Sequence, residues 1–230
     1  QLEELGQNTR YLYNVLNYQI TRRSVFQIET KLKDRDRTQS NFQQQNHRQE
    51  LNFANRVGIR YLGRQLMAAF AFTTSQETNQ SSSRPIGATE TRTDYDDLQS
   101  SLNFLMNWKM SPSDEANLSL VYIKYEYLSP DTAQTVDRDR IRFITDLFYR
   151  HRFSNYFSVG LFSSISLEHQ IYIHPSRSIN NNWNRIFQLG AQFDHEISER
   201  FRNSYQLEIL ANYTVYDFEE FLPEVRSYLF

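Results

Sequence analysis

The segment WNRIFQLGAQFDHEI, residues 183–197, alternates apolar and polar side chains along its whole length. The odd-numbered residues are apolar apart from Arg185 and His195, and the even-numbered residues are polar apart from Ile186. Successive side chains of a β-strand point to opposite faces of the sheet. The segment therefore predicts one long strand with an apolar side and a wet side.

The same period recurs along most of the chain and predicts an all-β, antiparallel up-and-down meander of about ten long strands. Alternation is clear at 51–61, 66–72, 98–110, 118–122, 141–152, 157–168 and 201–215, weaker at Arg10–Ile20 and Val25–Lys33, and begins again at Glu224–Phe230. These segments run to about 12 to 17 residues, against about 5 to 6 in soluble proteins and about 9 to 11 in a tilted membrane-crossing strand. The excess predicts strands that project from a membrane on one side.

The connections form two alternating classes. Short ones are expected near Thr21–Ser24, Leu62–Arg64, Ser111–Glu115, Phe153–Tyr156 and Ser198–Arg200. Long polar ones are expected near Asp34–Gln45, Ser75–Thr93, Ser129–Arg138, Ile171–Asn180 and Asp217–Pro223. Short turns at one end of a barrel and long loops at the other are typical of outer-membrane proteins.

On these features the chain resembles the transmembrane β-barrels of the Gram-negative outer envelope, over nearly all of its 230 residues. The resemblance implies location in the outer membrane, insertion by the barrel-assembly machinery, and contact with membrane lipid and lipopolysaccharide. The alternative is a soluble sandwich or a lipocalin-like barrel, which would have shorter strands and turns rich in glycine and proline. The chain contains only 6 glycines and 5 prolines, which favours the membrane barrel.

Composition excludes several other classes. The chain has no cysteine, so disulfide scaffolds, cysteine-bound zinc and iron–sulfur clusters are excluded, and no cofactor or metal is predicted. A net charge of −2 argues against a nucleic-acid partner. Aromatic residues make up 15% although mean hydropathy is −0.68, as expected when only every second strand residue faces lipid.

We treat residues 1–230 as a single β-barrel domain, and strand parity predicts that it is an excerpt of a larger barrel. The first clear strand leads into a short turn, so its start would lie on the extracellular side. Bacterial barrels usually have an even number of strands and periplasmic termini. A complete ten-strand barrel, with residues 1–8 crossing differently, is the alternative.

The polar parity supplies the predicted lumen-lining residues. They are Arg56, Arg60, Arg142, Asp146, Arg150, Glu168, Gln188, Gln192, Asp194, Arg202 and Glu208. The lumen would be either a water-filled path whose charges set selectivity or a wall closed by cross-strand ion pairs. Aromatic residues near strand ends would form the interfacial girdles: Tyr61, Trp108, Tyr122, Tyr149, Phe157, Trp183, Phe201 and Tyr213.

Other polar motifs are weaker. His169 with Glu168 at an extracellular strand end is the best catalytic candidate, although a plain loop-base histidine explains it as well. His151 and His195 fall on the apolar parity near short turns and suit interfacial anchoring. The runs 34–37 and 137–140, both Asp-Arg-Asp-Arg, read as solvated loops, or as contacts to lipopolysaccharide or a divalent ion. The segment Ser75–Thr93 reads as a mobile loop or a lumen constriction.

The leading expectation for function is a pore, or the barrel part of a transport or export system, without enzymatic activity. The alternatives are a structural sheath that encloses a partner protein in the lumen or periplasm, and an outer-membrane enzyme with a site at the extracellular rim. Only fold-level similarity connects the sequence to transport.

Overall fold

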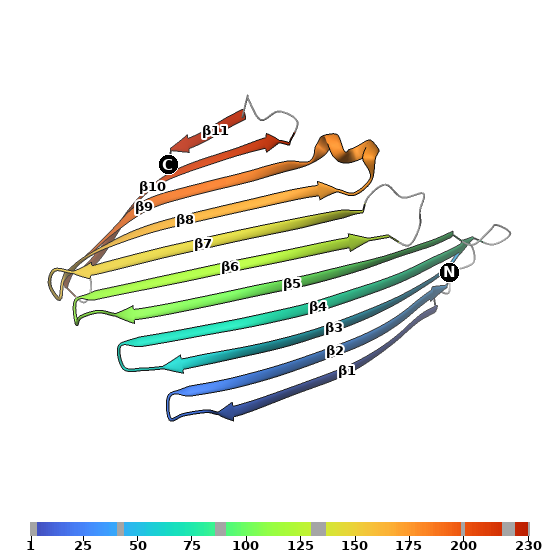
Figure 1. The fold of residues 1–230 in the computed structure, drawn as a ribbon, viewed down its shortest axis with the longest axis horizontal. Helices are drawn as coiled ribbons and strands as arrows, with labels where there is room; N and C mark the ends of the chain where they lie inside the picture. The colour runs from blue at the N-terminus through green and yellow to red at the C-terminus, as the bar shows by residue number, and fades with distance from the viewer. Residues whose placement is uncertain are drawn as a thin grey trace.

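The computed structural model describes residues 4–40, 44–85, 91–129, 137–198, 201–217 and 224–229, with the side chains of 4–5, 91–93, 197–198 and 224–229 left aside. Across these ranges the chain forms one antiparallel sheet of eleven strands, each hydrogen-bonded to its neighbours in the sequence (Figure 1). The predicted all-β meander is confirmed. No pairing between the first and last strands is present in the described part of the chain.

The strands are long, as the alternation predicts. They are β1 Glu4–Gln19, β2 Ser24–Ser40, β3 Gln44–Leu62, β4 Leu66–Pro85, β5 Thr91–Lys109, β6 Asp114–Leu128, β7 Arg138–Arg152, β8 Phe157–Tyr172, β9 Asn182–Ser198, β10 Phe201–Tyr216 and β11 Glu224–Leu229. A short 3-10 helix, η1 (Pro175–Asn180), connects β8 to β9. None of the described helical residues forms a segment long and apolar enough to cross a bilayer.

Tight turns lie together at one end of the sheet (Figure 1). The backbone N–H groups of Ile20, Met110 and Phe153 donate to the carbonyls four residues ahead, at 2.9, 3.0 and 3.0 Å. At the turn after β3 the Gly63 N–H donates to the Leu66 carbonyl at 2.8 Å. These contacts agree with four of the five predicted short turns, and residues 199–200 of the fifth lie outside the described ranges.

Two predicted loops are wrong for most of their length. Residues 34–40 belong to β2 and 75–85 to β4, both fully paired with β3, so the first Asp-Arg-Asp-Arg run is strand. The second run also enters a strand, since β7 begins at Arg138. The alternation pattern did not predict these strand ends because both faces of the segments carry polar side chains. The backbone ladder continues after the hydrophobic contrast has ended.

The sheet has two faces of opposite character. Leu189 and its cross-strand partners Ser163 and Ile209 lie on the apolar face, together with every second residue of each strand. Gln188 and the alternate residues lie on the polar face. Leu189 is 60% exposed and Leu207 is 63% exposed, and Ala71 is the one buried hydrophobic residue among the described side chains. A layer with such an exposed face lacks the packed interior of a soluble sandwich, so the apolar face requires a cover.

The apolar face has the height of a bilayer interior. On β3 it runs from Leu51 to Tyr61, which at about 3.4 Å per residue is about 34 Å along the strand. A tilt of about 40° reduces this to about 26 Å, close to the band of about 25 Å in outer-membrane barrels. Beyond Leu51 the same face continues with Gln49 and His47. The outer ends of β2–β5 therefore project past this band.

The polar face is the more enclosed of the two. Among the described side chains, Ala71, Asn79 and Ser101 are buried at 5%, 2% and 6% exposure, and all three lie on this face. The sheet therefore curves toward its polar side.

Close packing on the polar face depends on two glycines. The Phe162 ring lies over Gly190, where an added Cβ would come within 2.1 Å of the ring and 2.6 Å of the Leu207 carbonyl oxygen. The Phe148 ring covers Gly160 in the same way, with a closest approach of 3.1 Å. Glycine in a strand interior commonly permits such close approach.

Candidate functional site

All eleven predicted lumen-lining residues lie on the polar face. The cross-strand register links them in groups, for example Arg142 opposite Glu168 and Asp194 opposite Ser204. Residues that face each other directly in neighbouring strands share a face. The alternation of polar and apolar residues in the sequence therefore predicts that these residues share one side of the sheet. It does not predict whether that side encloses water.

Many of these charges and amides pair with each other across strands. Glu168 lies 3.7 Å from Arg142 and 4.0 Å from Arg140. The Gln188 amide donates to Glu208 at 2.9 Å, and Arg202 donates to Glu196 at 2.9 Å. The hydroxyl of Ser164 donates to Asp146 at 2.6 Å, and that of Ser204 donates to Asp194 at 2.8 Å. These contacts stabilise adjacent strands and leave much of the face with little net charge.

A smaller group of cations forms no close ion pair, although Arg56 lies directly opposite Glu29 in the neighbouring strand. Arg56, Arg60 and Arg150 form no ion pair with another described residue, and the Arg150 guanidinium lies 5.2 Å from the centre of the Phe148 ring. Arg150 also lines a cavity of about 460 Å³ at the turn end of the face, together with Arg152, Asp194, Glu196 and Arg202. The turn end of the polar face therefore has a cavity lined mainly by charged side chains.

The outer part of the polar face holds a network that sequence reasoning missed. The Asn79 amide lies 3.0 Å from the Tyr95 hydroxyl, and its oxygen, turned toward Arg48, accepts from that guanidinium at 2.8 and 3.2 Å. Arg48 also donates to Glu50 at 2.8 Å. The ring of Tyr95 stacks on that of Tyr127 at 5.5 Å. This network links β3, β4, β5 and β6 near their projecting ends, and it was missed because Asn79 was placed in a predicted loop.

The predicted girdle residues lie on the apolar face. They include Tyr61, Trp108, Tyr122, Phe157, Trp183 and Tyr213, while Phe201 is 52% exposed beside a register shift at the start of β10. The Trp183 ring stacks on His169 with centroids 4.2 Å apart, and Arg185 lies 5.9 and 5.8 Å from the centres of the Trp183 and Tyr213 rings. Aromatic rings next to polar partners suit a membrane interface.

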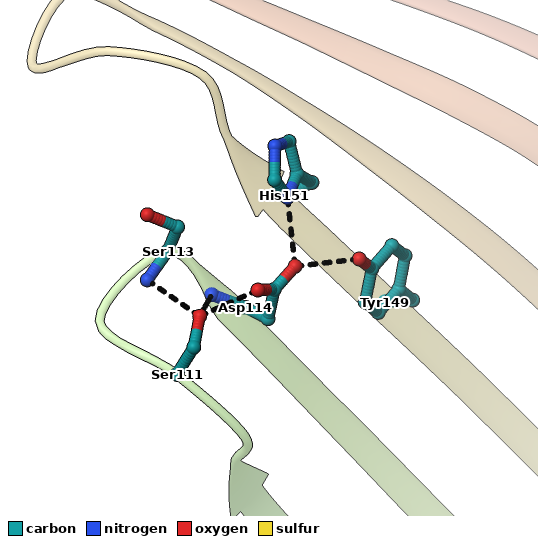
Figure 2. A network of polar contacts seen from close by, with 5 residues as sticks. All are labelled: Ser111, Ser113, Asp114, Tyr149 and His151. Atoms are coloured by element: carbon teal, nitrogen blue, oxygen red, sulfur yellow. Dashed lines mark hydrogen bonds and ion pairs between the residues drawn. The ribbon is translucent and has the colours of Figure 1, made fainter.

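The last girdle residue, Tyr149, belongs to a turn cluster on the same face (Figure 2). Its hydroxyl donates to Asp114 at 2.7 Å, and Nδ1 of His151 lies 2.7 Å from the same carboxylate oxygen. The second Asp114 oxygen accepts from Ser111. Asp114 stands at the turn itself, and its contact with His151, followed by those with Ser111 and Tyr149, holds the pKa of that carboxyl well below its usual range. The cluster fixes the hairpin at the edge of the apolar band.

The structure does not bring Glu168 and His169 together. Adjacent strand residues point to opposite faces, so Glu168 contacts arginines on the polar face while His169 stacks on Trp183 on the apolar face. His169 Nε2 instead lies 3.1 Å from Asp217, a partner that no sequence signal identified. His174 caps η1 by accepting from the Ser176 N–H. Within the described residues, no three His, Asp or Glu side chains are grouped to hold a metal ion.

Comparison with known proteins adds little to this geometry. No protein-family model matches the chain, and no curated protein matches it in sequence. Among solved structures, the chain is similar to OmpT (in-vitro folded), an outer membrane protein of Vibrio cholerae. The similarity covers 99% of this chain and 92% of that one, with 8% identity and a TM-score of 0.35. At that score the fold assignment depends on the strand pairing described above.

Proposed function

We propose that this chain forms all or part of an outer-membrane β-barrel of a Gram-negative bacterium, and that its polar face lines a path for solutes. The observation that carries the proposal is the single sheet with an exposed apolar face and a more enclosed, charged face. Backbone groups in lipid must be paired within the protein, and a closed sheet satisfies this requirement. Lipid then covers the apolar face, and water fills the space that the polar face surrounds.

The direction in the membrane follows from the connections. The tight turns would lie in the periplasm and the projecting ends of β2–β5 outside the cell, as in other barrels of this class. The proposed partners are outer-membrane lipid, lipopolysaccharide and the barrel-assembly machinery.

The proposed activity is passage through the lumen, either as a simple pore or as the barrel part of a transport or export system. Both signs of charge line the polar face, and many are paired. Rings of mixed charge favour weak selectivity between cations and anions. We therefore expect permeation limited mainly by size and by local charge, without a chemical step.

Two measurements on the full-length protein test the proposal. The first compares the gel mobility of boiled and unboiled protein from outer-membrane fractions, where a folded barrel shifts on boiling. The second is the conductance of the purified protein in a planar bilayer. A band without a shift would refute the barrel. A shifted band with a silent bilayer would refute the pore, and a co-purifying protein would then favour a sheath.

A further inference from the structure

We propose that a groove on the polar face, crossing β1–β5, binds a zwitterionic solute the size of a tripeptide or tetrapeptide. The inference rests on the proposed function only for the route by which the solute arrives. The groove has a volume of about 340 Å³. The argument follows from the register of the strands, the unpaired charges and the spacing between them.

Two neighbouring rows of cross-strand partners form the groove. One row runs Tyr11, Lys33, Asn52, Glu77, Asp97, and the other runs Tyr13, Lys31, Ala54, Ser75, Gln99. All of these residues except Tyr13 line the cavity. Ala54 and Ser75 are small, so the middle of the second row is low and forms the floor. The groove therefore lies across the strands, with β2 toward one end and β5 at the other.

The two ends carry opposite charges. Lys33 lies on β2, and Glu77 and Asp97 lie on β4 and β5; none of the three forms an ion pair with another described residue. The neighbouring Lys31 differs, because Glu29 lies 2.7 Å from its ammonium, and Arg35 above the groove lies 3.7 Å from Glu50. The groove thus keeps one cation and two anions that the protein does not neutralise.

The acidic end lacks a cation. Glu77 and Asp97 are direct cross-strand partners on one face, and like charges in this position destabilise a sheet. Oδ1 of Asp97 is shielded from solvent and has no hydrogen-bond partner. A buried acceptor without a partner costs stability, and it adds to the cost of the two like charges. An ammonium group in the groove beside the two carboxylates would offset their repulsion.

The distance between the ends sets the length of the ligand. Neighbouring strands lie about 4.8 Å apart, so Lys33 is about 10 Å from Glu77 and about 14 Å from Asp97 along the row. An extended peptide spans at most about 3.5 Å per residue. Three to four residues therefore place an amino terminus at the carboxylates and a carboxylate at Lys33. The Tyr11 ring, 63% exposed beside Lys33, offers an apolar surface for a side chain near that end.

The test is calorimetric titration of the full-length protein in neutral detergent with trialanine. Three matched peptides serve as controls: N-acetyl-trialanine, trialanine amide, and the doubly blocked form. We expect saturable binding of trialanine, weakened by salt, and about a ten-fold loss of affinity for each blocked terminus, since a hydrogen bond to a charged group is lost.

Variants assign each terminus to its end of the groove. Glu77→Gln should remove the difference between trialanine and its N-acetyl form, and Asp97→Asn should reduce it. Lys33→Gln should remove the difference between trialanine and its amide. Lys124→Gln, on the apolar face beside Glu126, is the matched control and should bind as the unchanged protein does. A mobility shift on boiling checks that each variant is folded.

Three results would overturn the proposal: no saturable binding, equal affinity for the doubly blocked peptide, or equal affinity for trialanine and its amide, which would indicate a simple cation site. Bilayer conductance is measured in parallel. Binding that depends on both termini, in a protein that does not conduct, would refute the pore and leave the groove as a binding site.

Discussion

An arginine scan at residues 188 and 189 tests which face of the sheet meets lipid. On β9 the apolar face extends from Trp183 to Phe193, interrupted by Arg185, and Leu189 lies about 20 Å and about 13 Å along the strand from Trp183 and Phe193. At a tilt of about 40° these distances become about 15 and about 10 Å of depth. Leu189→Arg near the middle of the bilayer should cost about 2–4 kcal/mol of folding free energy.

The neighbouring substitution provides the matched control. Gln188 lies on the opposite face, 2.9 Å from Glu208, so Gln188→Arg places its charge in water beside a carboxylate and should change stability by less than about 0.5 kcal/mol. A second control, His195→Arg, lies on the apolar face near a turn, where the cost should fall to about 0–1 kcal/mol.

The assay is reversible unfolding in denaturant with the protein in lipid vesicles, followed by tryptophan fluorescence. The reasoning predicts a cost that depends on face and on depth. It fails if Gln188→Arg costs as much as Leu189→Arg, or if Leu189→Arg and His195→Arg cost the same, because a protein interior has no reason to follow bilayer depth.

Three further outcomes are expected. Trp108 and Trp183 are the only tryptophans, so their fluorescence can be measured separately in single-tryptophan variants. Lipids brominated near the headgroup should quench this fluorescence more strongly than lipids brominated near the chain end. Stronger quenching by the chain-end bromines would place these residues outside the girdles. Gly190→Ala should cost about 1–3 kcal/mol in the same unfolding assay, because the Phe162 ring and the Leu207 carbonyl obstruct the new methyl group. The control Gly6→Ala should be nearly neutral, since the nearest atom is a carbonyl oxygen at 3.9 Å. Equal effects of the two substitutions would contradict the packing. Asp114→Asn should destabilise the protein most near neutral pH. A carboxyl whose pKa is lowered by folding stabilises the fold above its ordinary pKa of about 3.9, and it loses this effect as the pH falls through its pKa in the folded protein. A stability difference between the variant and the unchanged protein that persists in strong acid would contradict this.

Period-two alternation predicted the strands wherever the two sides of the sheet differ in polarity. The strand β9 follows its pattern almost residue by residue, because its two sides lie on the apolar and the polar face of the sheet. The pattern did not predict the strand residues 34–40 and 75–85. Alternation appears only where one side of a strand is apolar and the other polar, and both sides of these segments carry polar side chains. Hydrogen bonding between backbones, which no side-chain pattern encodes, continues these strands.

The candidate site shows the same division. Parity places Arg56 and Glu208 on a common face, because parity is a local property of each strand. The contact between Asn79 and Tyr95, the ring over Gly190 and the opposition of Glu77 to Asp97 depend on the register between strands. Register is set by turns and pairings distant in the sequence, so one sequence read alone did not reveal these contacts.

The projecting ends of β2–β5 affect how the sequence can change over evolutionary time. Inserting one residue into a strand reverses the side taken by every side chain beyond it. Within the apolar band that reversal would move Leu51 or Phe53 to the polar face and would be selected against. Beyond Leu51 both sides of the strand carry polar side chains, so single insertions and deletions there leave the apolar band in register. We therefore expect related chains to differ in length mainly at these projecting strand ends.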